Sequence, residues 1–181
     1  MGRRILTSWA YSSHFRRVCF GGNDAIIRAE QPMVWLVLTP PGVRVISPDK
    51  QPCFPAIMDT GYAGRLLLNV RHIPAWSGLQ TSQLVRSSVS ETVFGQTLSR
   101  YEVTAWLLPS DPTVDPESAY AHPFVMKIEH GATVMARSAA PPWNQRPEIP
   151  LIGLSAMAEN HLVLTIDARA RQIDLETNRK W

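Results

Sequence analysis

The apolar and polar positions along the chain predict a series of short β-strands. Met33–Leu38 is a continuous apolar run, typical of a strand buried on both faces, and a Pro-Pro-Gly turn at 40–42 ends it. Apolar and polar residues alternate in Val43–Ser47, which predicts another strand. Ala56–Met58 and Arg65–Leu68 are apolar segments on either side of a polar turn. This last turn is therefore expected to be held rigidly between two buried strands.

The rest of the chain predicts further strands and one short helix. Ser155 can cap a helix that ends near Asn160, because a serine hydroxyl accepts a hydrogen bond from the first turn. Strands are predicted at Leu84–Ser90, at Leu98–Leu108, in a hairpin of Phe124–Ile128 and Ala132–Ala136 that turns at His130-Gly131, and in a final hairpin of His161–Asp167 and Gln172–Leu175.

The pattern also divides the chain. Residues 1–31 show no sustained periodicity and are predicted to be a poorly ordered or loosely docked extension. Residues 32–181 are predicted to form a single domain, since a chain of 181 residues suffices for one core of ordinary size. Two Pro-rich stretches, 109–123 and 139–150, are expected to be long loops.

Composition and charge indicate the fold class and argue against membrane and nucleic-acid partners. With 45% hydrophobic residues and 15 prolines, the chain favours strands and turns over a helical bundle. No apolar run reaches the length of a membrane span, so no membrane partner is predicted. The formal charge is +3, and without Arg3, Arg4, Arg16 and Arg17 the rest of the chain carries −1. With no basic stripe in its body, the chain predicts no nucleic-acid partner.

Metal and cofactor chemistry finds little support in the sequence. The two cysteines, Cys19 and Cys53, form neither a metal-binding spacing nor a disulfide framework. This cysteine usage favours a reducing compartment such as the cytoplasm. The histidines are scattered, and no glycine-rich loop could cradle a phosphate. The sequence therefore predicts no metal and no cofactor.

The best candidates for catalytic residues are Asp59, Thr60 and Gly61. They occupy the polar turn between the two apolar segments at 56–58 and 65–68. An aspartate readily initiates a turn, and glycine supplies the backbone freedom that turns need. A carboxylate at the end of a buried strand is also rigidly placed, as a catalytic group must be.

This stretch resembles the active-site loop of the retropepsin-like aspartic proteases, in which apolar residues precede Asp-Thr-Gly. Pro150–Leu154 is similar to the apolar segment with a glycine that this family places before its one short helix, beside the catalytic loop. The resemblance implies an all-β fold: a closed β-barrel with one short C-terminal helix, acting as a symmetric homodimer. It implies that Leu151, Ile152 and Gly153 support the loop and that Gly153 lets two backbones come close.

The resemblance further implies an aspartic endopeptidase that hydrolyses peptide bonds of a peptide or protein substrate. Such chemistry needs two carboxylates that share a proton, one acting on water and the other on the scissile carbonyl. The chain contains one Asp-Thr-Gly, so the second Asp59 is expected from another copy in a homodimer. Thr60 would then bond across the interface, and the Gly61 amide would contact the carboxylate.

Other residues near this loop leave alternatives open. The segment Glu91–Gln96 is similar in position to the hairpin, or flap, that closes over substrate in the family, with Gly95 near its tip. Phe94 and Gly95 are the candidate flap or substrate residues in it, but an ordinary hairpin fits equally well. Tyr62 could line the site or pack in the core. A different class of function is a non-catalytic dimeric peptide-binding or scaffolding domain. A third reading is a monomeric β domain in which the turn motif arose by chance.

Overall fold

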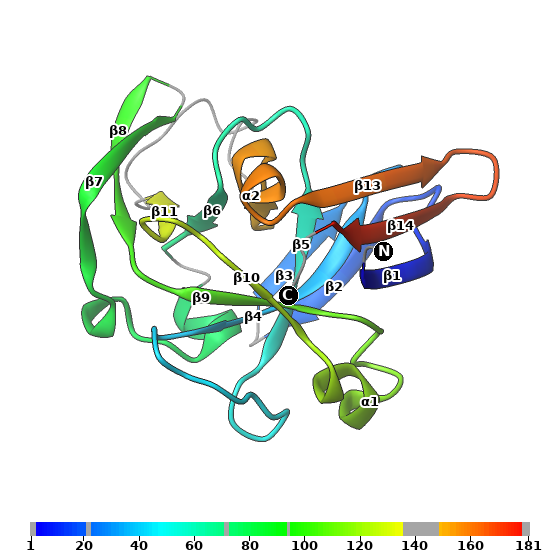
Figure 1. Cartoon of the computed structure of the whole chain (residues 1–181), viewed down its shortest axis with the longest axis horizontal. Coiled ribbons are helices and arrows are strands. Elements are labelled where there is room, and N and C mark those ends of the chain that lie inside the picture. Colours follow the sequence, from blue (N-terminus) through cyan, green and yellow to red (C-terminus); the bar gives the residue numbers. More distant parts are fainter. Residues whose placement is uncertain (1–2, 21–22, 71–72, 94, 136–148, 179–181) are drawn as a thin grey trace.

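The computed structural model describes residues 3–20, 23–70, 73–93, 95–135 and 149–178, and in these ranges the chain is mostly β (Figure 1). The strands are β1 (Arg3–Ala10), β2 (Arg16–Phe20), β3 (Asn23–Ile27), β4 (Met33–Thr39), β5 (Cys53–Met58), β6 (Leu66–Asn69), β7 (Arg86–Val93), β8 (Gln96–Tyr101), β9 (Thr104–Leu108), β10 (Phe124–Met126), β11 (Ala132–Met135), β12 (Leu151–Ile152), β13 (Leu162–Asp167) and β14 (Gln172–Thr177).

A nine-stranded mixed sheet forms the centre of the molecule, in the order β10-β9-β4-β5-β12-β6-β11-β8-β7. Strand β4 pairs antiparallel with β5 on one side and with β9 on the other. All seven residues of β4 are buried, as its continuous apolar run predicts, and Trp35 and Leu36 are fully inaccessible. Burial of such side chains drives the folding of this region.

Strand β12 lies between β5 and β6, although it comes more than eighty residues later in the chain. It is parallel to β5, with Leu151 opposite Ile57 and Ile152 opposite Met58, and antiparallel to β6. The loop that joins β5 to β6 therefore leaves the sheet directly beside the chain that follows β12.

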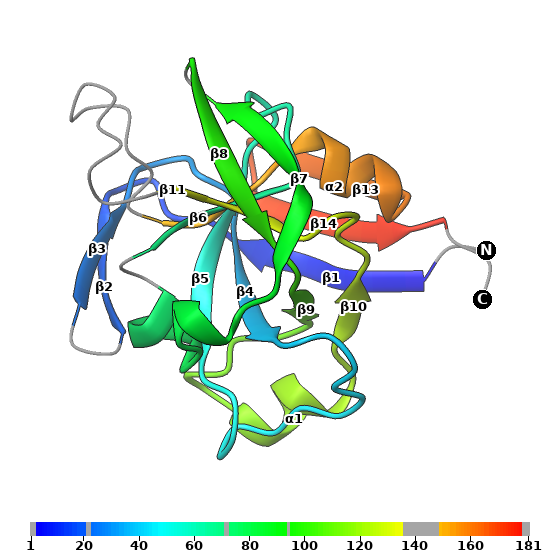
Figure 2. The same ribbon diagram turned by 90° about the vertical axis from the view of Figure 1, so that its left-hand side faces the viewer.

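Two smaller sheets flank this centre. Strands β1, β14 and β13 form a three-stranded antiparallel sheet, in which Leu6, Ile173 and Leu175 are buried. Strands β2 and β3 form a two-stranded ribbon (Figure 2). Residues 3–10, which belong to the predicted extension, are thus paired with the C-terminal strand β14.

The helices are short. Helix α1 (Pro116–Ala121) begins after Asp115, whose side chain accepts a hydrogen bond from the Ser118 amide. Helix α2 (Leu154–Glu159) follows β12 directly. A π-helical turn (Ile73–Ser77) and a 3-10 turn (Thr81–Gln83) lie between β6 and β7.

The predicted closed barrel is wrong. The large sheet ends in the edge strands β10 and β7, which do not pair with each other in the described part of the chain, so the sheet stays open. The expected single helix is also wrong, because α1 forms within the stretch 109–123 that was predicted to be a loop. The aspartate before Pro116 supplies the cap that a helix start needs.

Three local predictions also differ from the structure. Residues 43–47 form no strand, because Val45 is 79% exposed and Ser47 begins a turn in which its carbonyl accepts from Lys50 and Gln51. The predicted strand 98–108 is two strands, β8 and β9, which lie far apart in the sheet. The alternation of apolar and polar residues continues across Glu102 and Val103. At these two residues the chain leaves β8 and crosses to β9 on the other side of the sheet.

The predicted hairpin of 124–128 and 132–136 is wrong as well. Strand β10 pairs with β9, whereas β11 lies between β6 and β8. The turn is at His130 and Gly131, which both have positive φ angles, but it redirects the chain instead of reversing it. A Cβ on Gly131 would lie 1.9 Å from the Tyr101 carbonyl oxygen, so this crossing requires glycine. By contrast, the final hairpin β13–β14 forms as predicted.

Candidate active site

Asp59 stands at the carboxyl end of β5, where the chain leaves the central sheet. Its amide donates a hydrogen bond of 2.9 Å to the Ile152 carbonyl, which extends the β5–β12 pairing by one step. The backbone of Asp59 is therefore fixed by the sheet, while its side chain is half-buried.

The Asp59 carboxylate is held by its own loop. The Gly61 amide donates to Oδ1 over 2.8 Å, which is the contact expected of Gly61. This contact fixes the orientation of the carboxyl group relative to the loop. Thr60 is exposed and forms part of the outer surface of the loop. Its predicted bond across an interface stays a prediction.

The segment 151–155 supports the loop through close backbone contact. A Cβ on Gly153 would lie 2.3 Å from the Gly64 carbonyl oxygen and 2.5 Å from that of Tyr62, so no other residue fits without displacement. The Gly153 amide donates to the Arg65 carbonyl over 2.7 Å, and the Leu154 amide donates to the Tyr62 carbonyl over 2.9 Å. The close approach predicted for Leu151, Ile152 and Gly153 is thus present.

Ser155 has a different role from the predicted helix cap. Gly153 is the N-cap residue of α2 and provides no side-chain hydrogen bond. The Ser155 hydroxyl instead donates to the Ala63 carbonyl over 2.6 Å. The first turn of α2 is therefore bonded to the loop that carries Asp59.

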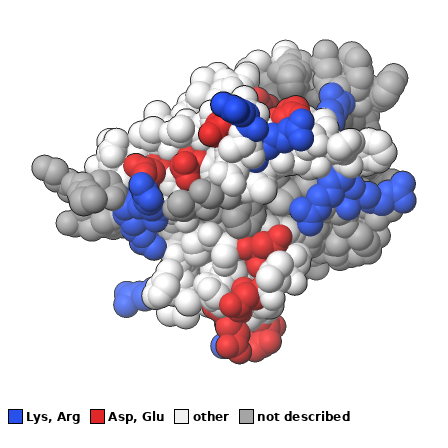
Figure 3. Space-filling view, turned by 90° about the vertical axis from the view of Figure 1, so that its right-hand side faces the viewer, with Lys and Arg blue, Asp and Glu red and all other residues white. Residues whose placement is uncertain are grey.

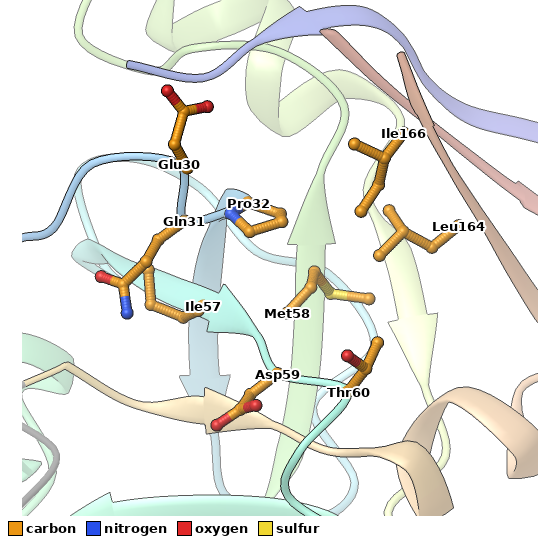
Figure 4. Close-up of a pocket in the computed structure, with 9 residues that line it drawn as sticks. All are labelled: Glu30, Gln31, Pro32, Ile57, Met58, Asp59, Thr60, Leu164 and Ile166. Atoms are coloured by element: carbon orange, nitrogen blue, oxygen red, sulfur yellow. The ribbon is translucent and has the colours of Figure 1, made fainter. Parts of the chain in front are cut away.

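A pocket of about 310 Å³ lies next to Asp59 (Figure 4). Met58, Leu164 and Ile166 give it apolar walls, and Asp59 and Thr60 line one end. Leu164 and Ile166 belong to β13, the edge strand of the small sheet. The Asp59 carboxylate points away from these two apolar side chains in the view of Figure 4.

The pocket contains a second carboxylate, that of Glu30, but it does not pair with Asp59. Figure 4 places Glu30 at the opposite end of the pocket, with its oxygens directed away from Asp59. The Glu30 carboxylate instead lies 3.8 Å from the Arg171 guanidinium. Among the residues that line this pocket, Asp59 therefore has no carboxylate partner from its own chain.

On the other side of the loop, Tyr62 reaches the hairpin β7–β8. Its hydroxyl donates to Glu91 Oε1 over 3.1 Å, and the other Glu91 oxygen accepts from the Thr133 hydroxyl. Arg100 Nε lies 3.9 Å from Glu91 Oε2. Burial, followed by the nearby Glu91 charge, raises the pKa of the Tyr62 hydroxyl above its usual range. Tyr62 is therefore a neutral hydrogen-bond donor at physiological pH.

Sequence patterns did not predict this cluster. Glu91, Arg100 and Thr133 come from three strands, and no local spacing connects them with Tyr62. The hairpin itself forms, with Val93 opposite Gln96 and Gly95 in its turn at a φ of 74°. Phe94, the other candidate flap or substrate residue of this hairpin, lies outside the described residues. Whether the hairpin closes over a substrate stays a prediction.

Charged side chains are distributed in separate groups on the face shown in Figure 3, and acidic residues gather at its lower end. No three His, Cys, Asp or Glu side chains within the described ranges are arranged to hold a metal ion. None of the helices in the part of the chain that the structure describes has the length and apolar character to cross a membrane.

Comparison of the chain with models of protein families, with curated proteins and with solved structures finds no match. The resemblance to the retropepsin-like aspartic proteases therefore rests on the two sequence motifs. Function has to be argued from the loop that carries Asp59 and from the residues around it.

Proposed function

We propose that the protein is an aspartic endopeptidase in which the Asp59 carboxylates of two copies act together on a peptide bond. The observation that carries the proposal is the support of the Asp59 loop. The loop is fixed by β12 through the hydrogen bond from the Asp59 amide to Ile152 and is bonded to the start of α2 through Ser155. Such support holds the Asp59 carboxyl group on a rigid part of the molecule, as a catalytic group requires.

The chemistry requires one ionised and one protonated carboxyl group. The ionised group takes a proton from water, whose oxygen attacks the carbonyl carbon of the scissile bond, while the protonated group donates to the carbonyl oxygen. The tetrahedral intermediate then collapses as the C–N bond breaks. The leaving amine takes the proton that the first carboxyl group accepted from water, and the second carboxyl group regains its proton as the carbonyl forms again. Two carboxylates in close contact share one proton readily, because both cannot easily be ionised together.

A second copy is the natural source of the second carboxyl group. Glu30 is directed away from Asp59 and lies near Arg171, so it is poorly placed to serve. Partly exposed apolar side chains lie close by, since Ile166 is 49% exposed and Leu164 is half-buried. Apolar surface beside an incomplete site favours association of two copies there.

The decisive experiment compares Asp59→Asn with the unaltered chain. Both are incubated with a mixed peptide library at mildly acidic pH, and products are identified by mass spectrometry. We expect the variant to lose cleavage by at least about a thousandfold, because one essential proton-transfer group is removed. Asp49→Asn is the matched control, since Asp49 is an exposed aspartate in another turn.

Two results would contradict the proposal. One is cleavage by Asp59→Asn at the rate of the unaltered chain, with circular dichroism showing that both are folded. The other is binding of library peptides without any cleavage by the unaltered chain. That second result would favour the alternative, a peptide-binding or scaffolding domain.

A further inference from the structure

Hairpin β7–β8 and the loop between β5 and β6 extend from the same side of the central sheet in Figures 1 and 2. The two are not neighbours in the sheet, because β12, β6 and β11 lie between β5 and β8. A direct side-chain bond nevertheless joins them, from the Tyr62 hydroxyl to Glu91. Tyr62 lies three residues after Asp59, so this bond acts close to the candidate catalytic group.

Tyr62 is held tightly in position for this bond. A Cβ on Gly64 would lie 2.2 Å from the Tyr62 hydroxyl and 2.2 Å from Glu91 Oε1, so both groups occupy the space above Gly64. A Cβ on Gly153 would lie 2.6 Å from the Tyr62 ring. Two glycines thus make the room in which the Tyr62 ring and the Glu91 carboxylate meet.

Glu91 is in turn fixed by strands β8 and β11. The Thr133 hydroxyl donates to Oε2, and the guanidinium of Arg100 approaches the same oxygen. The Arg100 side chain is only 3% exposed, and its terminal nitrogen donates to the carbonyls of Glu129 and Gly131. Its Nε has no hydrogen-bond partner among the described residues, and Glu91 supplies the negative charge that this buried cation needs.

We propose that Glu91 is a positioning residue that joins hairpin β7–β8 to the Asp59 loop through Tyr62 and sets the separation between them. This inference rests on the proposed function only in one respect, namely that a peptide substrate occupies the space between hairpin and loop. Loss of the bond frees the hairpin to move away from the loop. A smaller fraction of molecules then has the spacing that binds a peptide, which weakens apparent binding without changing the reacting groups.

The test uses Tyr62→Phe, which removes the hydroxyl and keeps the ring. Tyr120→Phe is the matched control, because the Tyr120 hydroxyl also donates a hydrogen bond, to the Gln51 carbonyl, but in a different region. Amide hydrogen exchange is measured by mass spectrometry on the full-length chain. We expect Tyr62→Phe to accelerate exchange in β7, β8 and residues 59–65 by about tenfold, the effect of losing a hydrogen bond to a charged group. Tyr120→Phe leaves these segments unchanged.

Glu91→Gln and the double variant complete the test. If the two side chains act through one bond, adding Tyr62→Phe to Glu91→Gln accelerates exchange less than adding it to the unaltered chain. Where the unaltered chain cleaves peptide, Tyr62→Phe is expected to raise KM by up to about tenfold and leave kcat nearly the same.

Unchanged exchange in Tyr62→Phe would overturn the inference, as would equal acceleration in both tyrosine variants. The exchange measurement needs no peptidase activity. A chain that cleaves nothing but shows the expected exchange pattern refutes the proposed function and retains the positioning role. A chain that cleaves peptide but shows no exchange effect supports the proposed function and refutes the positioning role of Glu91.

Discussion

Gly153 shows how one residue without a side chain determines the geometry around Asp59. Its φ angle of −96° is accessible to any residue, so glycine is required by contact and not by conformation. The carbonyls of Gly64 and Tyr62 occupy the place of a Cβ. Because both contacts are to backbone, an alanine here must push the Asp59 loop away from β12.

We therefore expect Gly153→Ala to lower the free energy of unfolding by about 2–4 kcal/mol, in the range of severe overpacking. Urea denaturation of the purified chain measures this. Gly42→Ala is the control, since no atom of the residues that the structure describes lies within 4 Å of a Cβ there and only its φ of +88° causes strain. A loss for Gly153→Ala no larger than that for Gly42→Ala would contradict the contact argument.

The comparison of Asp59 with Glu91 shows which site residues a sequence can reveal. Asp59, Gly61 and Gly153 belong to short motifs whose residue types are themselves unusual for strands, so their contacts could be predicted. Glu91 is one polar residue in an alternating strand, where a glutamate is most often solvated. Its importance comes from Tyr62 and Arg100, which reach it only after the sheet has formed.

At the scale of elements, Asn160 connects three parts of the molecule. It follows α2 and is fully buried. Its side-chain amide bonds both the amide and the carbonyl of Lys127, at 2.7 and 2.8 Å, and also donates to Ala156 in the helix. Its carbonyl accepts from the Thr177 hydroxyl on β14. Helix α2 is thereby tied to the segment after β10 and to the C-terminal strand.

Replacing Asn160 by Ala leaves the partly buried amide and carbonyl of Lys127 without these partners. We expect a loss of about 2–4 kcal/mol in the free energy of unfolding, because each polar group that loses its partner away from full solvent contact is destabilising. Asn178→Ala is the matched control on the exposed end of the chain and is expected to change stability by less than about 0.5 kcal/mol. Thermal or urea unfolding of the two variants measures this difference in stability. Equal midpoints would show that α2 is held by other contacts.

The strands were predictable where the local pattern was sufficient. The apolar run of β4 predicts a buried strand, and the alternation of apolar and polar residues in β13 and β14 predicts two more strands. Pairing is a different matter, because a period of two residues does not identify the partner strand. Residues 98–108 keep one alternation while the chain leaves β11 for β4, and β1 finds its partner at the other end of the sequence. Which strand pairs with which therefore depends on packing of the whole core.

At the scale of the whole molecule, the proposed peptidase activity would depend on whether one chain or a pair of chains forms the site. Asp59 lies beside a pocket whose far wall is the edge strand β13, and Ile166 of this wall is substantially exposed. A second copy that brings its own Asp59 beside this one would exclude water from both carboxyl groups and strengthen the hydrogen bond through which they share one proton. Association and catalysis would then depend on each other, and specific activity would fall on dilution.

Mixing of subunits tests this dependence directly. Asp59→Asn changes no apolar contact, so the variant is expected to pair with unaltered copies as readily as these pair with one another. In an equal mixture that has exchanged fully, about one quarter of the pairs keep both carboxylates. Activity at constant total chain concentration should then fall to about a quarter of that of the unaltered chain, whereas independent monomers would retain about half. Asp49→Asn, mixed in the same way, should leave the activity unchanged. A value of one half for Asp59→Asn would mean that each chain completes its own site, and the second carboxyl group would then have to come from the same copy.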